Sequence, residues 1–448
     1  MFIINQITPK HTLFLYIIRH ASFDISNAST PAACRFPLTE REVVRYNVPR
    51  MKSRKDELEE WVTGVIFNRA HGFRAWVMRC ILRAVSWVFY IIVKVRLLVF
   101  RRRLRTVHYL GTLVVSVGNI TAGGTGKTPV VELLARTLAA RGRKCAILTR
   151  GYKSADLPKR QVWRDANGKR VKRLPKIASD GTTRYLSPLY AGDEHYMLAR
   201  NLDGVAVLVD KDRVKSGIFA IEQLGSNTLI LDDGMQYLKL RHEIDIVLVD
   251  CGFPFGTGAL LPRGTMREPR TSLARASYII LTKSGGKPQD ELIATIRRYN
   301  ALADIIVTNH APSYLENVFT GERKPLSYLA GKYVACLSGI ARPESFEKLV
   351  EDQHANLVIR RRYPDHHWFD QAEMEAFIER CANRAIDMIV TTEKDAVRLK
   401  EPEDIEVPVY FLRISIEINR GHDAWQRLID NIIALGSPQP APEWGDVL

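Results

Sequence analysis

The sequence has few cysteines, and none of them stands in a pattern typical of a metal site or a disulfide framework. Six cysteines are scattered over 448 residues, and no two form a CxxC pair. This spacing excludes a zinc–thiolate site and is typical of a reduced, cytosolic protein. The sequence also lacks an internal repeat and a recognisable signal-peptide cleavage site. We therefore expect neither a secreted fold held by disulfides nor a cleaved leader.

Long uncharged runs are missing as well. In the apolar stretch 75–100 the longest uncharged run is Ala84–Val93, ten residues, about half of the ~20 that an ordinary membrane-spanning helix needs. The polar residues of this stretch recur at steps of three, four or seven, which predicts one polar stripe on a helix: Arg79, Arg83, Ser86, Tyr90, Lys94 and Arg101. A basic stripe beside a broad apolar face with Trp and Tyr is typical of a helix in a membrane interface. The alternative is a helix that packs on the protein's own core.

The composition is that of a globular protein with an excess of positive charge. Hydrophobic residues make up 46% and charged residues 25%, which excludes a collagen-like, coiled-coil or largely disordered chain. Lys and Arg number 65 against 49 acidic residues, so the net charge is 65 − 49 = +16. This excess indicates an anionic partner, which could be nucleic acid, a phospholipid surface or a phosphorylated substrate. The run of arginines at 101–105 favours an anionic membrane surface.

Changes in pattern divide the chain into five expected parts. These are a loose N-terminal extension (1–50), a membrane-associated helical segment (51–110), an α/β kinase-like domain (111–320), a smaller C-terminal α/β domain (332–436) and a loose tail (437–448), with a linker within 311–331. Apolar strands alternate with helical segments after residue 111. This alternation predicts a mostly parallel sheet with helices on both faces.

The strongest local pattern is a glycine-rich segment, GNITAGGTGKT at residues 118–128, between an expected strand and an expected helix. This context is that of a phosphate-binding loop (P-loop), whose glycines let backbone N–H groups turn toward phosphates. Lys127 is expected to reach the β- and γ-phosphates of ATP, and the Thr128 hydroxyl to bind Mg²⁺. A strict P-loop has glycine six positions before the lysine, where this sequence has Thr121. The predicted ATP-binding residues are Thr121, Ala122, Gly123, Gly124, Thr125, Gly126, Lys127 and Thr128.

A second pattern is the apolar strand TLIL followed by Asp232, Asp233, Gly234 and, two residues later, Gln236. A strand that ends in Asp is what P-loop enzymes use to hold Mg²⁺. An Asp-Gly turn is the ordinary alternative, but a turn does not need the second carboxylate.

Three further segments are weak when taken alone. Gly192-Asp193-Glu194 reads as the capped start of a helix. The adjacent histidines His366 and His367 follow a Pro-Asp and read as a loop. The segment 391–395, TTEKD, reads as a capping box.

Taken together, these segments resemble the tetraacyldisaccharide 4'-kinase family, which acts in lipid A synthesis. GNITAGGTGKTP, RGY from Arg150, GDE, LDDGMQ, REP from Arg267, PDHH and TTEKDA occur in that order. The resemblance covers about residues 111–435 and does not include 1–50. The basic, aromatic helix before residue 111 is similar to the family's N-terminal membrane helix.

The resemblance implies transfer of the γ-phosphate of ATP to the 4'-hydroxyl of a lipid A disaccharide 1-phosphate, at the cytoplasmic face of the inner membrane. It implies that Asp193 and His366 form the pair that activates the sugar hydroxyl, with His367 as the other candidate histidine. It further implies that Asp232, Asp233 and Glu268 lie around Mg²⁺ with Thr128. The remaining candidates that it implies near the phosphates are Gln236, Arg150 and Arg267.

Two other functions remain as alternatives at this point. A membrane-associated regulatory ATPase also combines a GGTGKT loop with an amphipathic helix, but such loops generally carry Lys where this sequence has Ala122. A nucleic-acid-dependent ATPase would explain the charge, but the basic residues lack the aromatic interleaving of a single-strand channel. We therefore expect no nucleic-acid partner, and no protein partner is implied.

Overall fold

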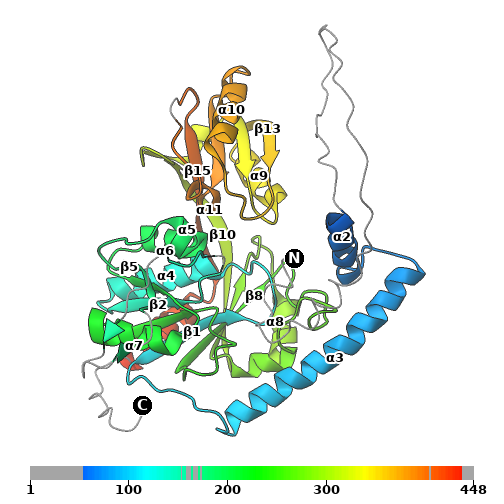
Figure 1. Cartoon of the computed structure of the whole chain (residues 1–448), viewed down its shortest axis with the longest axis vertical. Coiled ribbons are helices and arrows are strands. Elements are labelled where there is room, and N and C mark those ends of the chain that lie inside the picture. The colour runs from blue at the N-terminus through cyan, green and yellow to red at the C-terminus, as the bar shows by residue number, and fades with distance from the viewer. Residues whose placement is uncertain are drawn as a thin grey trace. The chain divides into compact units, whose positions relative to one another are not determined.

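The computed structural model describes residues 54–152, 154–157, 163–164, 170–171, 174–402 and 405–435 (Figure 1). The extensions expected at 1–50 and 437–448 lie outside these residues. The described residues form two compact units: those up to Ile92 together with 256–267, and those from Val93 to Phe255 together with those after Arg267.

The larger unit is built on one sheet, to which the described residues contribute 13 strands. The strand order is β13-β12-β14-β15-β10-β9-β8-β1-β7-β2-β6-β5, with β11 beside β10. Pairing is parallel except at β10–β15, β5–β6 and β10–β11. The strands are β1 (Leu113–Asn119), β2 (Cys145–Thr149), β5 (Lys176–Asp180), β6 (Ala206–Val209), β7 (Thr228–Asp232), β8 (Ile244–Asp250), β9 (Tyr278–Thr282), β10 (Asp304–Asn317), β11 (Arg323–Lys324), β12 (Tyr333–Ser338), β13 (Asn356–Arg362), β14 (Met388–Thr392) and β15 (Val409–Arg420); a separate hairpin pairs β3 (Trp163–Arg164) with β4 (Arg170–Val171).

Helices cover both faces of this sheet. Successive side chains of a strand point to opposite faces, and in β1 Val115 and Val117 pack with α4 and α12 whereas Val114 packs with α7. The expected fold class, a P-loop type α/β fold with a mostly parallel sheet, is confirmed. The helices of this unit are α4 (Lys127–Ala140), α5 (Pro188–Ala191), α6 (Asp193–Asn201), α7 (Arg213–Leu224), α8 (Asp290–Arg297), α9 (Pro343–Glu351), α10 (Gln371–Ala382), α11 (Glu393–Ala396) and α12 (His422–Leu435), with 3₁₀ turns at Arg270–Arg275 and Leu326–Leu329.

The expected linker at 311–331 is not a linker in the structure. Its first part is the second half of β10, which pairs along its length with β15. Figure 1 shows these long strands running from the P-loop half of the sheet toward α9 and α10. The C-terminal α/β part therefore continues the same sheet, and no break in the sheet falls at 320–332.

A largely buried arginine connects the two halves of this unit. The guanidinium of Arg413 on β15 forms ion pairs with Glu132 of α4 and with Glu393 of α11. Both carboxylates are buried. Since an unpaired buried charge is costly, the three side chains stabilise one another only when α4, α11 and β15 are all in place.

The smaller unit contains α2 (Arg54–Ile66) and most of α3 (Phe73–Arg101). In α3 only Ala75, Leu82 and Ser86 are buried. The Ser86 hydroxyl donates to the Leu260 carbonyl at 2.9 Å and accepts from the Arg263 N–H at 3.0 Å. The large apolar side chains of α3 are instead exposed, among them Trp76, Ile81, Trp87, Val88, Ile91, Ile92, Val95 and Leu98. No helix in the described ranges is both long enough and apolar enough to cross a membrane.

Candidate active site

The glycine-rich loop connects the end of β1 to the start of α4, at the carboxyl edge of the parallel strands where α/β folds bind ligands. Its shape is fixed by the buried Asn119, whose Nδ2 donates to the Thr121 carbonyl at 2.7 Å and to Thr125 Oγ1 at 3.0 Å. Gly123 has φ 121° and Gly126 has φ 79°, backbone conformations that favour glycine. Thr121 is buried with its hydroxyl 3.4 Å from the same Asn119 amide, so it takes part in the loop's internal contacts.

The lysine and the paired aspartates meet at this loop. Lys127 Nζ lies 3.5 Å from Asp233 Oδ1 and 3.4 Å from Asn119 Oδ1. Asp232 ends β7, which pairs with β1, so the strand register places the two aspartates beside the loop. Asp233 has φ 56°, a conformation rare outside glycine and often found at functional sites.

Whereas Asp233 is partly exposed, Asp232 is buried. Its Oδ2 lies 3.5 Å from Thr149 Oγ1 and 4.0 Å from His195 Nε2, whereas its buried Oδ1 has no hydrogen-bond partner among the described residues. Burial raises the pKa of Asp232; the charge of Asp233 acts in the same direction and His195 opposes it. A cation beside Oδ1 would relieve this cost.

The residues present fit a divalent cation with oxygen ligands. Among the described residues, no three His, Cys, Asp or Glu side chains cluster so as to hold a metal on their own. A metal at Asp232 would therefore need the Thr128 hydroxyl and phosphate oxygens as further donors, which is the chemistry Mg²⁺ prefers. Thr128 Oγ1 now donates to Glu194 Oε2 at 2.9 Å.

The structure brings Asp193 and His366 into direct contact. His366 Nδ1 lies 2.8 Å from Asp193 Oδ2, and both side chains are largely buried. Burial raises the pKa of Asp193, but the hydrogen bond from His366 and the charges of Arg398 and Lys394 outweigh it, so the net pKa lies below the ordinary value. Asp193 is the first residue of α6, and the N-cap is Gly192, so the expected capping role of its side chain is wrong.

The two adjacent histidines have different surroundings. His366 has φ 64° and faces Asp193, and the ring of Tyr152 lies edge-on to it at 6.1 Å. His367 instead stacks on Tyr363 at 4.5 Å, and its Nε2 lies 2.8 Å from Glu373. Only His366 of the two is therefore in contact with Asp193.

Two residues of the TTEKDA segment and its continuation complete this cluster. Lys394 Nζ lies 3.1 Å from His366 Nε2, and Arg398 Nε lies 3.6 Å from Asp193 Oδ2. Sequence reasoning missed both residues, because it assigned 391–395 only a local cap. That cap is confirmed: the Thr392 hydroxyl accepts from the Asp395 N–H at 3.1 Å.

The remaining predicted residues lie around the loop at different points. Gln236 Nε2 donates to the Asn119 carbonyl and to Glu268 Oε1, each at 3.0 Å. Glu268 also pairs with Arg275 at 2.7 Å, so its described contacts are on the β1 side of the loop and not with the aspartates. Arg150 is exposed and directly follows β2. The pKa of Arg213 is lowered mainly by burial and to a smaller extent by the charge of Arg150, so Arg150 lies near Arg213. Arg267 is partly buried directly before Glu268.

Arg213 is a second residue that the sequence patterns did not indicate. It is buried, its Nη2 donates to the Asp232 carbonyl at 3.4 Å, and its guanidinium lies over the Tyr237 ring at 4.8 Å. Nothing in the local sequence distinguishes it from an ordinary helix-starting arginine.

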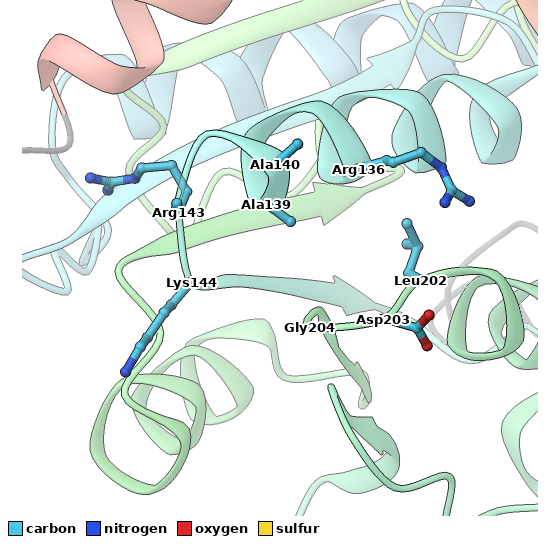
Figure 2. Close-up of a pocket in the computed structure, with 9 residues that line it drawn as sticks. Arg136, Ala139, Ala140, Arg143, Lys144, Leu202, Asp203 and Gly204 are labelled. Atoms are coloured by element: carbon cyan, nitrogen blue, oxygen red, sulfur yellow. The ribbon is translucent and has the colours of Figure 1, made fainter.

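A cavity of about 440 Å³ lies elsewhere, where α4 ends and β2 is about to begin (Figure 2). It is lined by Arg136, Arg143, Lys144 and Asp203 among others. In Figure 2 the Lys144 side chain points away from Arg136, so the basic groups do not converge on one point. Arg143 already donates to Thr228 Oγ1 and to the Asn227 carbonyl. None of the predicted site residues lines this cavity, so it is not the candidate site.

Comparisons with known proteins show which family the chain belongs to. A sequence model of the family described as tetraacyldisaccharide-1-P 4'-kinase matches residues 78–434. A tetraacyldisaccharide 4'-kinase of Syntrophus aciditrophicus is 40% identical over 68% of this chain and 80% of its own length. One from Anaeromyxobacter sp. (strain K) is 39% identical over 74% of this chain and 84% of its own.

A solved structure gives the same result. The crystal structure of LpxK from Aquifex aeolicus in complex with ATP has a TM-score of 0.61 and 25% identity, covering 79% of this chain and 99% of that one. The match with the family extends through the P-loop, the Asp193–His366 pair and α12. The chain therefore belongs to the tetraacyldisaccharide-1-P 4'-kinase family.

Proposed function

We propose that this protein transfers the γ-phosphate of ATP to the 4'-hydroxyl of a tetraacyl disaccharide 1-phosphate, a step of lipid A synthesis. The observation that carries the proposal is the contact between Asp193 and His366 beside a P-loop, within a chain of this family. Phosphoryl transfer needs positioning and charge neutralisation more than covalent chemistry by the protein. The site offers both kinds of group.

The P-loop would bind the phosphates of ATP. The backbone N–H groups of residues 121–126 would hold the phosphates, and Lys127 would neutralise their charge. Lys127 is now paired with Asp233 at 3.5 Å, so its ammonium is already held at the mouth of the loop.

Mg²⁺ would be held by Thr128, Asp232 and Asp233. The unpaired, buried Asp232 Oδ1 is the observation that supports this set. When bound, the ion would neutralise charge on the phosphate oxygens. Glu268 stays a candidate ligand only by resemblance, because Arg275 and Gln236 occupy its carboxylate.

Asp193 and His366 would act on the hydroxyl group of the lipid acceptor. A carboxylate held in place by an imidazole can accept the proton of the attacking hydroxyl as the new P–O bond forms. The net pKa of Asp193 lies below its ordinary value, so this carboxylate is ionised at neutral pH. Glu194, the next residue, contacts Thr128 and so joins the acceptor end to the P-loop.

The exposed apolar side of α3 supports a membrane location. Its tryptophans and aliphatic side chains, together with the arginines at 101–105, suit the cytoplasmic face of the inner membrane, where apolar burial and attraction to anionic headgroups add together.

The test is an ATP-dependent phosphorylation assay with a tetraacyl disaccharide 1-phosphate in detergent micelles. We expect a product with one added phosphate at the 4' position, identified by mass spectrometry of its fragments. A matched acceptor with a blocked 4'-hydroxyl should give none. ATP hydrolysis at an equal rate with and without acceptor, and no phosphorylated lipid, would instead support the regulatory ATPase.

A further inference from the structure

The smaller unit contains a cavity of about 340 Å³ between one side of α3 and the segment 259–263. Two arginines line it, Arg83 of α3 and Arg263 of that segment, together with the aromatic residues Trp87 and Tyr90. The volume lies within the range of ordinary small-molecule sites. None of the predicted site residues lines this cavity, so it is a separate candidate for ligand binding.

Arg263 is buried, and its described hydrogen bonds are to neutral groups. Its Nη1 donates to the Ile66 carbonyl at 3.1 Å, and its Nη2 donates to Asn68 Oδ1 at 2.7 Å. Its Nε has no hydrogen-bond partner among the described residues. A guanidinium has five N–H donors, and a buried donor without a partner is costly. Arg263 therefore has donors left for a ligand in the cavity.

Arg79 and Arg83, one turn apart on α3, add two positive charges near Arg263. Burial lowers the pKa of Arg263, and the charges of Arg83 and Arg79 lower it further. Arg79 donates to the Ala70 carbonyl, and its buried Nε has no partner in the part of the chain that the structure describes. No carboxylate of the described residues pairs with any of the three arginines. An anion in the cavity would relieve the repulsion between them.

Ser86 fastens the segment 259–263 to α3. Its hydroxyl accepts from the backbone N–H of Arg263 at 3.0 Å and donates to the Leu260 carbonyl at 2.9 Å. Ser86 is buried, so both hydrogen bonds are shielded from water. Arg83 and Arg263 therefore come from two elements that are held together, which gives the cavity a defined shape.

The aromatic part of the cavity wall borders the exposed apolar side of α3. Trp87 is 65% exposed, and its ring lies edge-on to that of Tyr90, with the ring centroids 6.0 Å apart. Val88 and Ile91, the next apolar residues along the helix, are also exposed. Such tryptophans and tyrosines are typical of the boundary between membrane and water. A ligand with an anionic head and an apolar tail would contact both the arginines and the aromatic rings.

We propose that this cavity binds the phosphate group of an anionic phospholipid of the bilayer, with the arginines on the phosphate oxygens and the aromatic rings beside the acyl chains. Guanidinium groups bind phosphate through paired hydrogen bonds, which makes arginine the usual choice for this anion. The proposal goes beyond the transfer reaction, because the ligand is a lipid of the surrounding membrane and not the acceptor. It also differs from the general attraction of the arginines at 101–105 to an anionic surface, because one lipid molecule is held at one site.

The test is a calorimetric titration of the full chain in a nonionic detergent with dihexanoyl phosphatidylglycerol, with micelles that lack protein as the blank. We expect saturable binding of one lipid per chain. Arg83→Gln and Arg263→Gln should each weaken it at least about tenfold, because a hydrogen bond to a charged group is lost. Circular dichroism checks the folding of both variants, and the exposed Arg83 provides the variant that disturbs packing least.

The matched control is Arg102→Gln, which removes an equal charge from an exposed position directly after α3 and should bind like wild type. Dihexanoyl phosphatidylcholine should bind more weakly, because the arginines repel its quaternary ammonium. Inorganic phosphate should also bind more weakly, since it has no apolar part to contact the rings.

Three results would overturn the proposal: no saturable binding to wild type, unchanged binding to a folded Arg83→Gln protein, or equal binding of inorganic phosphate, which would assign the cavity to the free ion. Binding of phosphatidylcholine as tight as that of phosphatidylglycerol would also overturn it, because the site would then not select an anionic lipid. The titration needs no turnover, so its result is independent of the proposed kinase activity.

Discussion

His366 and Asp193 are 173 positions apart in the sequence, and their side chains meet at 2.8 Å across the same compact unit. The sheet makes this contact possible, because β10 and β15 continue it from the P-loop half to the half that carries the histidine. The distance between the two side chains therefore depends on how the two halves of the sheet are placed relative to each other. A small change in either half would separate the two side chains, which the proposed base catalysis needs at hydrogen-bond distance.

Removal of either member of this pair should slow the chemical step. We expect Asp193→Ala and His366→Ala each to lower kcat by ~10²–10⁴-fold, the usual contribution of a general base, with little change in KM for ATP. Because the two act as a unit, the double variant should be only slightly worse than the more damaging single one. Steady-state kinetics with the lipid acceptor measures both quantities.

The control for that prediction is the neighbouring histidine. His367 contacts Tyr363 and Glu373 and not Asp193, so His367→Ala should cost much less activity. Fully additive losses in the Asp193/His366 double variant would contradict the shared role. So would a fully active Asp193→Asn protein.

Loss of the P-loop lysine should reduce turnover strongly. We expect Lys127→Ala to lower kcat by on the order of 10² or more, because the charge on the transferred phosphoryl group is no longer neutralised. Thr128→Ala should in addition raise the Mg²⁺ concentration needed for half-maximal rate. A Lys127→Ala protein with near wild-type activity would refute the nucleotide-site assignment.

The exposed side of α3 should determine binding to anionic vesicles. Trp76 and Trp87 are 58% and 65% exposed, and burying such side chains is worth ~1.5–3 kcal/mol each. The Trp76→Ala/Trp87→Ala protein should therefore partition at least about tenfold less well into vesicles of anionic phospholipid, measured by co-sedimentation. Leu302→Ala, which removes a 95% exposed side chain of the larger unit, is the matched control and should bind like wild type. High salt should weaken binding without abolishing it, and equal binding by all three proteins would count against the membrane role of α3.

A pH dependence of stability is expected from His310 on β10. Its Nε2 is buried beside Gly126 of the P-loop, and a Cβ added at Gly126 would lie 2.8 Å from it. Burial, together with the charge of Lys283, lowers the pKa of His310 to about 4. As the pH falls below the ordinary value of 6.5, the unfolded chain takes up a proton that the folded chain refuses, so the free energy of unfolding decreases from pH 6.5 to pH 4.

His310→Gln removes this contribution. The difference in free energy of unfolding between wild type and variant, from urea titrations, should change in favour of the variant by ~2 kcal/mol between pH 7 and pH 4.5. Other titrating groups are common to both proteins and cancel in that difference. A difference that is independent of pH would show that His310 titrates normally in the folded protein.

Much of this fold could be predicted from local patterns, and the errors have identifiable causes. The strand and the helix expected on either side of the glycine-rich segment are present as β1 and α4. The linker was expected within 311–331 because that stretch contains Pro, Gly and Asn residues. In the structure the pairing of β10 with β15 shifts register between Pro312 and Tyr314, and this irregularity accommodates the proline.

Less of the candidate site than of the fold could be predicted from local sequence patterns. The P-loop is local, so its residues followed from spacing. The contact of Asp193 with His366 is a tertiary contact between residues far apart in the sequence. Only the family resemblance predicted that these two residues belong to one site. Lys394 and Arg398 follow Thr392, whose side chain caps the start of α11. This cap is a sufficient explanation of the local sequence pattern. The pattern therefore does not indicate that Lys394 contacts His366 or that Arg398 lies close to Asp193.

The bridge made by Arg413 limits how this protein could have been assembled from parts. Because one guanidinium is shared by Glu132, on the helix that starts with Lys127, and Glu393, next to Lys394, the nucleotide-binding elements and the acceptor-binding elements are not exchangeable modules. A chain cut before β14 would lose Arg413, and Glu132 would keep only Arg136 and Asn201 among its described polar contacts. Chimaeras between relatives should therefore exchange α4, α11 and β15 together.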